Sequence, residues 1–159
     1  DDLDHQTAIA RVIRKYKPEI VLANAVRDRH PDHGKGGSLA SHACFISGLR
    51  KLETTMDGVA QEVWRPKFVY HYIQNEYIEP DLVVDISSYW ETKKESILAF
   101  KSQFHNPDSQ EPESFISRPE FLDFIEARSR ELGHKINVEF GEGFTVERVA
   151  GVKNLFSLI

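Results

Sequence analysis

The chain has 159 residues, of which 40% are hydrophobic and 28% charged, and its net charge is -5 at pH 7. This composition is typical of a globular domain, and the length fits one domain or most of one. The acidic balance, without a Lys/Arg stripe, argues against a nucleic acid or an anionic membrane as the main partner. Cys44 is the single cysteine, which excludes an internal disulfide and a cysteine-based zinc finger and favours a small buried apolar role.

The first quarter of the chain predicts a helix, a strand and a second helix. Apolar residues recur at helical spacing through residues 7–17, and Pro18 ends the pattern. Residues 19–25 are a short apolar run, which indicates a buried strand. After the glycine-rich residues 34–37, Ser38 is a candidate N-cap for the next helix. The loop between them therefore follows the carboxyl end of a strand, the edge at which open α/β sheets bind ligands.

This loop holds the densest group of chemically active side chains, the sequence Asp28-Arg29-His30-Pro31-Asp32-His33. Pro31 fixes the backbone between the two histidines, so the loop is stiff and the rings need not point the same way. One imidazole could bind a metal while the other serves as an acid or base, with Asp32 or Asp28 accepting a ring N–H. The alternative is a solvated polar turn in which Asp32 caps the next helix.

The motif resembles the second signature of the LmbE-like (PIG-L type) zinc-dependent N-deacetylases. The resemblance continues, in the same order, through Ser47-Gly48-Leu49-Arg50-Lys51, Pro80-Asp81-Leu82-Val83-Val84-Asp85-Ile86-Ser87, Lys101-Ser102-Gln103-Phe104 and Glu142-Gly143-Phe144. The ordered set covers nearly the whole chain and is similar to the branch that deacetylates N-acetylglucosaminyl-malate in bacillithiol synthesis. It implies an α/β fold, a three-layer α/β/α Rossmann-like sandwich.

The resemblance also implies roles for the residues of the loop. His33 would be a zinc ligand, and zinc would polarise water and the amide carbonyl. His30 would be the protonated acid that stabilises the oxyanion and helps the amine leave, and Asp32 would orient His30. The substrate would be a small-molecule glycoconjugate.

Two arginines are candidate substrate contacts under this resemblance. Arg29 and Arg65 would suit a carboxylate-bearing aglycone such as malate, because a guanidinium pairs well with a carboxylate. A surface arginine stacked on Trp64 is an equally good interpretation of Arg65. Near the C-terminus the family has the sequence Tyr-Ala-Glu-Gly-Phe, and here Phe140 replaces the tyrosine and Gly141 the alanine. A phenol that contacts substrate is therefore absent at this position.

One departure from the family concerns the N-terminus. Members begin with a strand and an Ala-His-Pro-Asp-Asp type motif that contributes a zinc-binding histidine, a zinc-binding aspartate and the general base. This chain contains no such sequence and opens on Asp1-Asp2-Leu3-Asp4-His5, where Asp4 is the expected helix N-cap. We therefore interpret residues 1–159 as the C-terminal part of a single deacetylase-like domain whose N-terminal strands and helices are missing.

The remaining segments complete an α/β pattern. We predict, in order, a loop over 53–65, strands over 68–73 and 81–86, a helix over 88–104, a long connection over 105–117, a helix from Ser117 to Gly133 and a strand over 136–140. His71 alternates with two tyrosines along its strand, which favours an ordinary sheet-face position over a ligand role. The mostly apolar tail is expected to pack on the domain or on a neighbouring subunit.

The sequence thus predicts a metal-dependent hydrolase that removes the N-acetyl group, a linear amide, from an N-acetylglucosamine conjugate. It shows no signal peptide and no apolar run that could span a bilayer, so we expect a cytoplasmic homo-oligomer. The alternative is an inert fragment or oligomerisation module, because a hydrolytic zinc site uses three protein ligands and only His33 is identified here. A metallohydrolase built from this chain alone would need His5, His71 or His105 to converge on His33, and the spacing gives no support for that.

Overall fold

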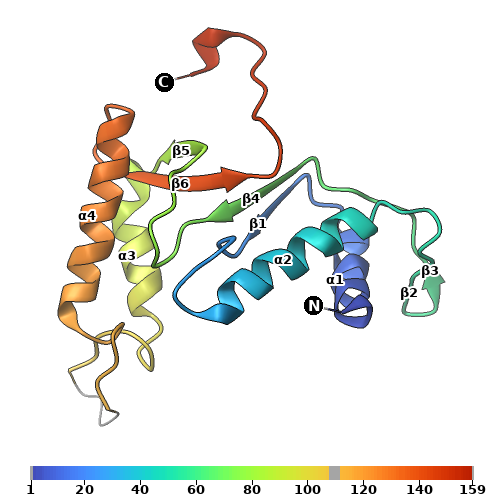
Figure 1. The fold of residues 1–159 in the computed structure, drawn as a ribbon, viewed down its shortest axis with the longest axis horizontal. Helices are drawn as coiled ribbons and strands as arrows, with labels where there is room; N and C mark the ends of the chain where they lie inside the picture. Colours follow the sequence, from blue (N-terminus) through green and yellow to red (C-terminus); the bar gives the residue numbers. More distant parts are fainter. Residues whose placement is uncertain (1, 108–111, 159) are drawn as a thin grey trace. The chain divides into compact units, whose positions relative to one another are not determined.

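The computed structural model describes residues 2–107 and 112–158 and has the predicted mixed α/β class (Figure 1). Its helices are α1 (Leu3–Tyr16), α2 (Pro31–Ile46), α3 (Trp90–Leu98), α4 (Pro119–Lys135) and the short 3-10 helices η1 (Ser87–Tyr89) and η2 (Leu155–Ser157). Its strands are β1 (Ile20–Ala23), β2 (Thr55–Met56), β3 (Val59–Ala60), β4 (Phe68–Tyr72), β5 (Leu82–Asp85) and β6 (Gly141–Val146). In the described part of the chain, no helix has both the length and the apolar composition that a membrane span requires.

The main sheet has the strand order β1-β4-β6-β5. β1 and β4 are parallel, with Ala23 opposite His71, and β6 runs antiparallel to β4, with Phe144 opposite Tyr72. The carboxyl ends of β1 and β4 therefore lie at the same edge of the sheet. The segments that follow these two strands begin side by side, and they form the candidate site.

The described residues divide into two compact units, and the boundary between the units falls inside β5 and β6. The first unit holds residues 2–82 and 143–158, with α1, α2, β1 and β4. The second unit holds the rest, with α3 and α4.

The core of the first unit lies between α1, α2 and the β1–β4 pair. Ile13, Ala43 and Cys44 are buried there, and the partly buried side chains of Ile9, Val21, Trp64 and Val69 pack against them. Cys44 is 3% exposed, and burial raises the pKa of its thiol to about 11. The predicted role of this cysteine as a small buried apolar residue is confirmed.

Helix α2 begins seven residues before the predicted N-cap at Ser38. His30 is the N-cap instead, Pro31 occupies the first turn, and the glycines at 34, 36 and 37 lie inside the helix. The interpretation of residues 34–37 as a loop was wrong because glycine here serves close packing rather than a turn. A Cβ on Gly37 would lie 2.9 Å from the backbone oxygen of Asn24, so the helix can approach the end of β1 only without a side chain.

Two adjacent glycines of α2 give a matched pair of substitutions. Gly37→Ala is expected to lower the free energy of unfolding by about 1–3 kcal/mol, because the new methyl group would press on two backbone oxygens, of Asn24 and Ala25. In Gly36→Ala the new methyl group meets only the Asn24 side chain, at 3.4 Å. This substitution should raise the free energy of unfolding by up to about 1 kcal/mol, because alanine favours the helix more than glycine does. Urea unfolding of both variants measures the difference. Equal effects would show that α2 does not pack this closely on the end of β1.

The predicted loop over 53–65 contains a hairpin. β2 and β3 pair antiparallel across Asp57-Gly58, and both turn residues have positive φ, 53° and 77°. These angles are those of a type I′ turn, for which Asp-Gly is a preferred sequence. The prediction was wrong because each strand has only two residues, too few to show an alternating pattern.

The core of the second unit is aromatic. Trp90 of α3 stacks on Phe140 with ring centroids 4.5 Å apart, and Ile86 and the α4 residue Ile125 pack against this pair. The guanidinium of Arg130 lies 4.4 Å from the Phe140 ring centroid. Phe140, which the resemblance placed where a tyrosine was expected, is 4% exposed and is a core residue.

The strand predicted over 136–140 is absent, and the last strand is β6, which begins at Gly141. Helix α4 continues past Gly133 to Lys135 and ends in a Schellman motif. Val138 N–H donates to the Gly133 carbonyl, Asn137 N–H donates to the His134 carbonyl, and Asn137 has a φ of 60°. The alternation of apolar residues over 136–140 thus came from a helix cap and the core residue Phe140.

The ends of the other helices differ from the predictions in small ways. The N-cap of α1 is Asp2, not Asp4, and it accepts the backbone N–H of His5 at 3.0 Å. Helix α3 ends at Leu98 and the chain continues in turns, whereas the helix was predicted to reach residue 104. Helix α4 starts at its proline, but the cap residue is Arg118 and no side chain bonds the cap. Part of the connection over 105–117 lies outside the described residues.

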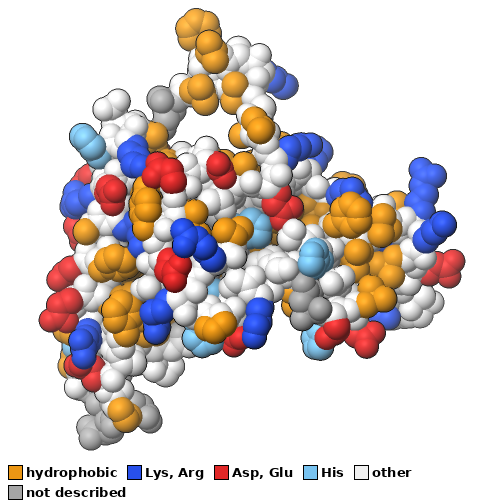
Figure 2. Space-filling model, in the orientation of Figure 1, with side chains coloured by type: hydrophobic (Ala, Val, Ile, Leu, Met, Phe, Trp, Pro, Cys, Tyr) orange, Lys and Arg blue, Asp and Glu red, His pale blue; other side chains and the backbone are white. Residues whose placement is uncertain are grey.

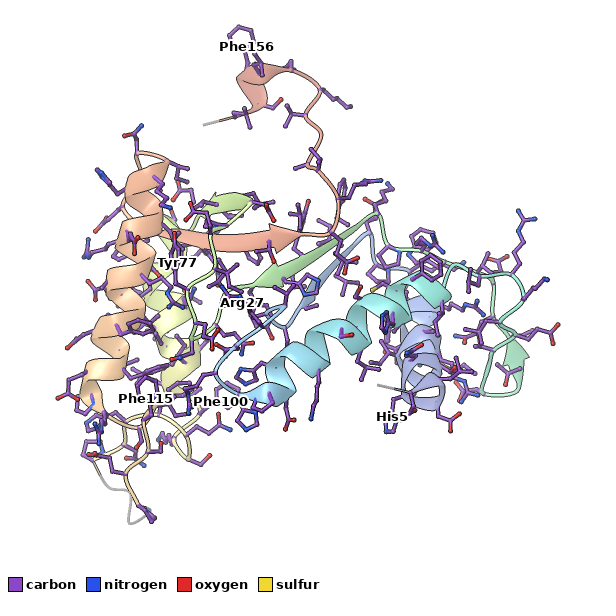
Figure 3. All side chains as sticks on the ribbon, viewed as in Figure 1. His5, Arg27, Tyr77, Phe100, Phe115 and Phe156 are labelled. Atoms are coloured by element: carbon purple, nitrogen blue, oxygen red, sulfur yellow. The ribbon has the colours of Figure 1, made fainter. Side chains whose placement is uncertain are left out.

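The C-terminal tail, which belongs to the first unit, was predicted to pack on the domain or on a neighbouring subunit. Its apolar side chains are exposed: Val149 is 88% exposed, Leu155 79% and Phe156 98%. Figure 2 shows hydrophobic side chains on the surface of the segment that carries η2, and Figure 3 labels Phe156 in η2. Packing of this tail on a neighbouring subunit stays a prediction.

Candidate functional site

The candidate site is built on the loop that follows β1 and on the first turn of α2. The His30 side chain caps the helix, since its Nδ1 atom accepts the backbone N–H of Asp32 at 3.3 Å. The Asp32 carboxylate lies 3.8 Å from the same ring nitrogen, which is an ion-pair distance rather than a hydrogen bond. Both side chains are largely exposed, 55% for His30 and 72% for Asp32, so the pair is only weakly attractive.

Asp28 orients His33. Its Oδ2 atom lies 2.5 Å from His33 Nδ1, and its side chain is only 1% exposed. An ionised carboxylate can only accept, so Nδ1 carries the proton and Nε2 keeps its lone pair. Of the two aspartates that the sequence offered as partners for a ring N–H, Asp28 is the one that hydrogen-bonds a histidine ring, and the ring is that of His33.

Asp28 also ties the loop after β1 to the segment after β4. Its Oδ1 atom accepts the backbone N–H groups of Asn75, at 3.0 Å, and Glu76, at 2.7 Å. Burial tends to raise the pKa of Asp28, but the hydrogen bonds from Glu76, His33, Arg29 and Asn75 outweigh it and leave the pKa below its ordinary value. The carboxylate is therefore ionised at neutral pH, as its role toward His33 requires.

The two histidine rings lie near each other, with centroids 5.4 Å apart and planes tilted by 35°. Among the described residues, the Nε2 atoms of His30 and His33 have no hydrogen-bond partner. A carboxylate on Nδ1 and a free lone pair on Nε2 are the features of a metal-binding histidine, so His33 fits one position of a zinc site.

The described residues do not by themselves form a whole zinc site. Nowhere in residues 2–107 and 112–158 do three His, Cys, Asp or Glu side chains come together in a group that could hold a metal ion. The idea of a metallohydrolase built from this chain alone therefore finds no support in the described residues. His5 instead bonds Asp2, with Nδ1 2.8 Å from the carboxylate.

His71 has the sheet-face position that its alternation predicted. It is 3% exposed, and both of its ring nitrogens are used: Nδ1 lies 2.7 Å from the Asn24 carbonyl and Nε2 3.1 Å from the Glu147 carboxylate. This ring links the ends of β1, β4 and β6. Both contacts are with protein oxygens, which agrees with a structural role for this ring.

The arginines next to the histidines lie on the same loop. Arg27 pairs with Glu76, at 3.3 Å, and donates to the Tyr77 carbonyl at 3.5 Å; Figure 3 labels Arg27 and Tyr77. These contacts are a second link, after that of Asp28, between the loop that follows β1 and the segment that follows β4. Arg29, the predicted substrate contact, is exposed and lies between Asp28 and His30.

Arg65 lies at the other edge of the sheet. It precedes the first residue of β4, and its guanidinium is 4.4 Å from the ring centroid of Phe45, whose carbonyl it bonds at 2.8 Å. Phe45 is twelve residues beyond His33 in α2, which corresponds to about 18 Å along the helix. The structure does not bring Arg65 to the histidines. It stacks on Phe45 rather than on Trp64.

Comparisons with known proteins bear on the fold. No family model matches the chain. The conserved protein TT1542 from Thermus thermophilus superposes with a TM-score of 0.81 at 25% sequence identity, over 98% of this chain and 63% of that one. GalB, the 4-carboxy-2-hydroxymuconate hydratase from Pseudomonas putida KT2440, gives a TM-score of 0.72 at 21% identity, over 98% and 62%. The N,N′-diacetylchitobiose deacetylase from Pyrococcus horikoshii gives 0.70 at 24% identity, over 90% and 51%.

These similarities confirm the predicted α/β fold class, with a central sheet and helices. The chain spans less than two thirds of the length of each of the three structures. One of them is a deacetylase and another a hydratase, so the shared fold carries more than one chemistry.

Proposed function

We propose that this chain is part of a zinc-dependent N-deacetylase of the LmbE-like family. The observation that carries the proposal is the contact of the buried Asp28 carboxylate with His33 Nδ1, which leaves Nε2 of His33 free beside the second histidine of the motif. The similarity in fold to a chitobiose deacetylase agrees with it. The remaining metal ligands and the general base would come from a His-x-Asp-Asp segment that precedes the described chain.

In this proposal each residue of the loop has a separate task. His33 holds one position of the zinc site, and Asp28 keeps its ring in the tautomer that can do so. The chemistry that a bound zinc ion supplies is Lewis-acid polarisation of the amide carbonyl and of water.

His30 is the proposed acid. Because Nδ1 accepts the Asp32 N–H, neutral His30 carries its proton on Nε2; the acid is the imidazolium form, which would give its Nε2 proton to the leaving amine and return to a neutral ring. When the ring is protonated, Nδ1 carries a proton as well, and the Asp32 carboxylate is the anion that lies 3.8 Å from this nitrogen. Asp32 thus supports His30 through its backbone N–H in one state and through its charge in the other.

The proposed substrate is an N-acetylglucosamine conjugate, with N-acetylglucosaminyl-malate as the first candidate. The similarity to a deacetylase of N,N′-diacetylchitobiose supports an N-acetylated amino sugar. Arg29 would contact a carboxylate of the aglycone. The same role for Arg65 would need an Arg65 from a second copy of the chain or a ligand about as long as α2, because Arg65 lies at the far end of that helix.

The proposal predicts how activity depends on the missing segment and on His33. With the preceding segment present, the protein should bind about one zinc per chain and release free amine from N-acetylglucosaminyl-malate. His33→Ala should lower kcat/KM by at least a hundredfold together with zinc content. His30→Ala should lower kcat by a similar factor with zinc retained. Amine release and metal analysis measure both.

A histidine later in the same helix gives the control. His42 lies in the fourth turn of α2, and His42→Ala should leave zinc content and kcat/KM within about twofold. If the protein instead hydrates an unsaturated carboxylate and releases no amine, it is a hydratase and the deacetylase proposal is wrong. A protein with the preceding segment but without bound zinc or amine release would favour the inert module.

We also propose that the chain forms a homo-oligomer. The exposed apolar side chains of the C-terminal segment, from Val149 to Leu158, are a surface that a neighbouring copy could cover. Light scattering on the purified chain measures the oligomeric state.

A further inference from the structure

A pocket of about 410 Å³ opens in the first unit at the C-terminal half of α2. Its walls come from α2, from residues 65–70 at the start of β4, and from Glu147 and Arg148, which follow β6. The apolar part of the lining includes Phe45 and Phe68. A pocket of this volume with a largely apolar wall is of the size that holds a small organic molecule.

Two guanidinium groups flank this pocket, and each is stacked on a ring. Arg65 lies 4.4 Å from the centroid of Phe45, and Arg148 lies 4.9 Å from the centroid of Phe68. A Cβ on Gly48 would lie 2.5 Å from Arg65 Nε, so the close packing of Arg65 on the end of α2 depends on that glycine. Stacking fixes the plane of a guanidinium while its N–H edge is left for a ligand.

The charges around the pocket are not balanced. Among the described residues, Arg65 and Arg148 have no carboxylate partner; Arg65 donates only to the Phe45 carbonyl. Of the other charged groups of the lining, Lys67 pairs with Glu19 at 2.6 Å, and the Glu147 carboxylate lies 3.1 Å from the His71 ring, which is charged only when it is protonated. Two unpaired cations therefore face a mostly apolar cavity in a chain whose net charge is negative.

We infer that this pocket binds a small organic oxyanion, a carboxylate or phosphate monoester carried on an apolar or aromatic body. The two guanidinium groups bind the oxyanion, since Arg matches planar oxyanions with paired N–H donors. The aromatic and apolar wall holds the body of the ligand. This inference goes beyond the proposed deacetylase, because it concerns the end of α2 opposite His33.

Titration of the 159-residue chain with benzoate and phenyl phosphate tests this inference. Backbone amide NMR signals of Phe45, Phe68 and Arg148 are expected to shift in a saturable way with at least one of the two probes. Which probe binds more tightly separates a carboxylate from a phosphate ligand. Benzamide, which lacks the charge, and inorganic phosphate, which lacks the apolar body, should each bind at least tenfold more weakly.

Substitutions then assign the binding to the two arginines. Arg65→Gln and Arg148→Gln should each weaken the better probe about tenfold. Arg128→Gln is the matched control: it removes an arginine that also stacks on a ring, 4.5 Å from Phe124, in the other unit, and it should leave the affinity unchanged. Because Arg65 packs on Gly48, Arg65→Lys serves as a second variant that keeps the charge and loses the planar fork, and it should bind several-fold more weakly.

Three results would overturn the inference: no saturable shift with either probe, equal binding of benzamide, or equal weakening by Arg128→Gln. None of them depends on zinc or on deacetylation, so a failure here is separate from a failure of the proposed function.

Discussion

Arg14→Met is expected to lower the free energy of unfolding by about 3–5 kcal/mol, a large part of the stability of a small domain. Arg14 is 3% exposed in the core of the first unit. Its guanidinium donates to the carbonyls of Ser47, at 2.9 Å, Leu49, at 2.9 Å, and Leu52, at 2.7 Å, and to the hydroxyl of Thr54, at 2.7 Å.

The large effect follows because the substitution leaves buried hydrogen-bond acceptors without their donors. The acceptors belong to the end of α2 and to the segment that leads to β2, and without Arg14 they would be buried with fewer donors. Methionine fills much of the space of the arginine stem, so the loss reports on hydrogen bonds more than on a cavity. Arg14→Lys keeps the charge but cannot reach all four acceptors, and should cost about half as much.

Urea unfolding measures this prediction, with Arg11→Met as the control. Arg11 lies one turn earlier on the same helix and is exposed, so the same change of charge should alter stability by less than about 0.5 kcal/mol. If the two variants are equally stable, the hydrogen bonds of Arg14 contribute nothing net to the fold.

The order α1, β1, α2, β4 could be predicted from residue patterns, because these elements have clear runs or periodicities of apolar residues in the sequence. The predictions failed where a sequence pattern that is typical of one structure serves a different structural role in the fold. Glycine at 34, 36 and 37 indicates a turn by composition, yet in the fold it lets α2 pack on the end of β1. Apolar residues at 136, 138 and 140 alternate like a strand, yet they belong to a helix cap and a core contact.

The partner of His33 shows a similar limit at the site. The motif offers Asp28 and Asp32 equally, and no local rule chooses between them. The choice follows from the sheet: β1 and β4 pair in parallel with Ala23 opposite His71, a constant offset that brings Asp28 beside Glu76. Asp28 is buried by a segment 47 and 48 residues away, and this burial makes it the stronger partner. This register could not be predicted from the sequence alone.

Arg65 was placed with the substrate contacts by resemblance, and the same register explains why the structure separates it from the histidines. Arg65 stands before the first residue of β4, whereas the histidine motif follows the last residue of β1. In a parallel pair these are opposite edges of the sheet. The structure thus gives the two predicted substrate arginines, Arg29 and Arg65, different surroundings.

Asp28→Asn is expected to reverse the tautomer of His33. The amide can accept from Asn75 and Glu76 only through its oxygen, because two backbone N–H groups already point at that side. Its NH₂ group then faces His33 Nδ1, which must become an acceptor, so the ring proton moves to Nε2. A protonated Nε2 has no lone pair for a metal, and zinc affinity of the complete site should fall by about 10–100-fold.

The tautomer can be measured directly in the 159-residue chain, without metal or substrate, from the ¹⁵N chemical shifts of the His33 ring near neutral pH. The unsubstituted chain should show Nδ1 protonated, and Asp28→Asn should show Nε2 protonated. Asp32→Asn is the control: it makes the same chemical change at an exposed carboxylate of the same motif. It should leave the tautomer of His33 unchanged. If His33 keeps its proton on Nδ1 in Asp28→Asn, then Asp28 does not set the tautomer, and the feature on which the zinc proposal rests has another cause.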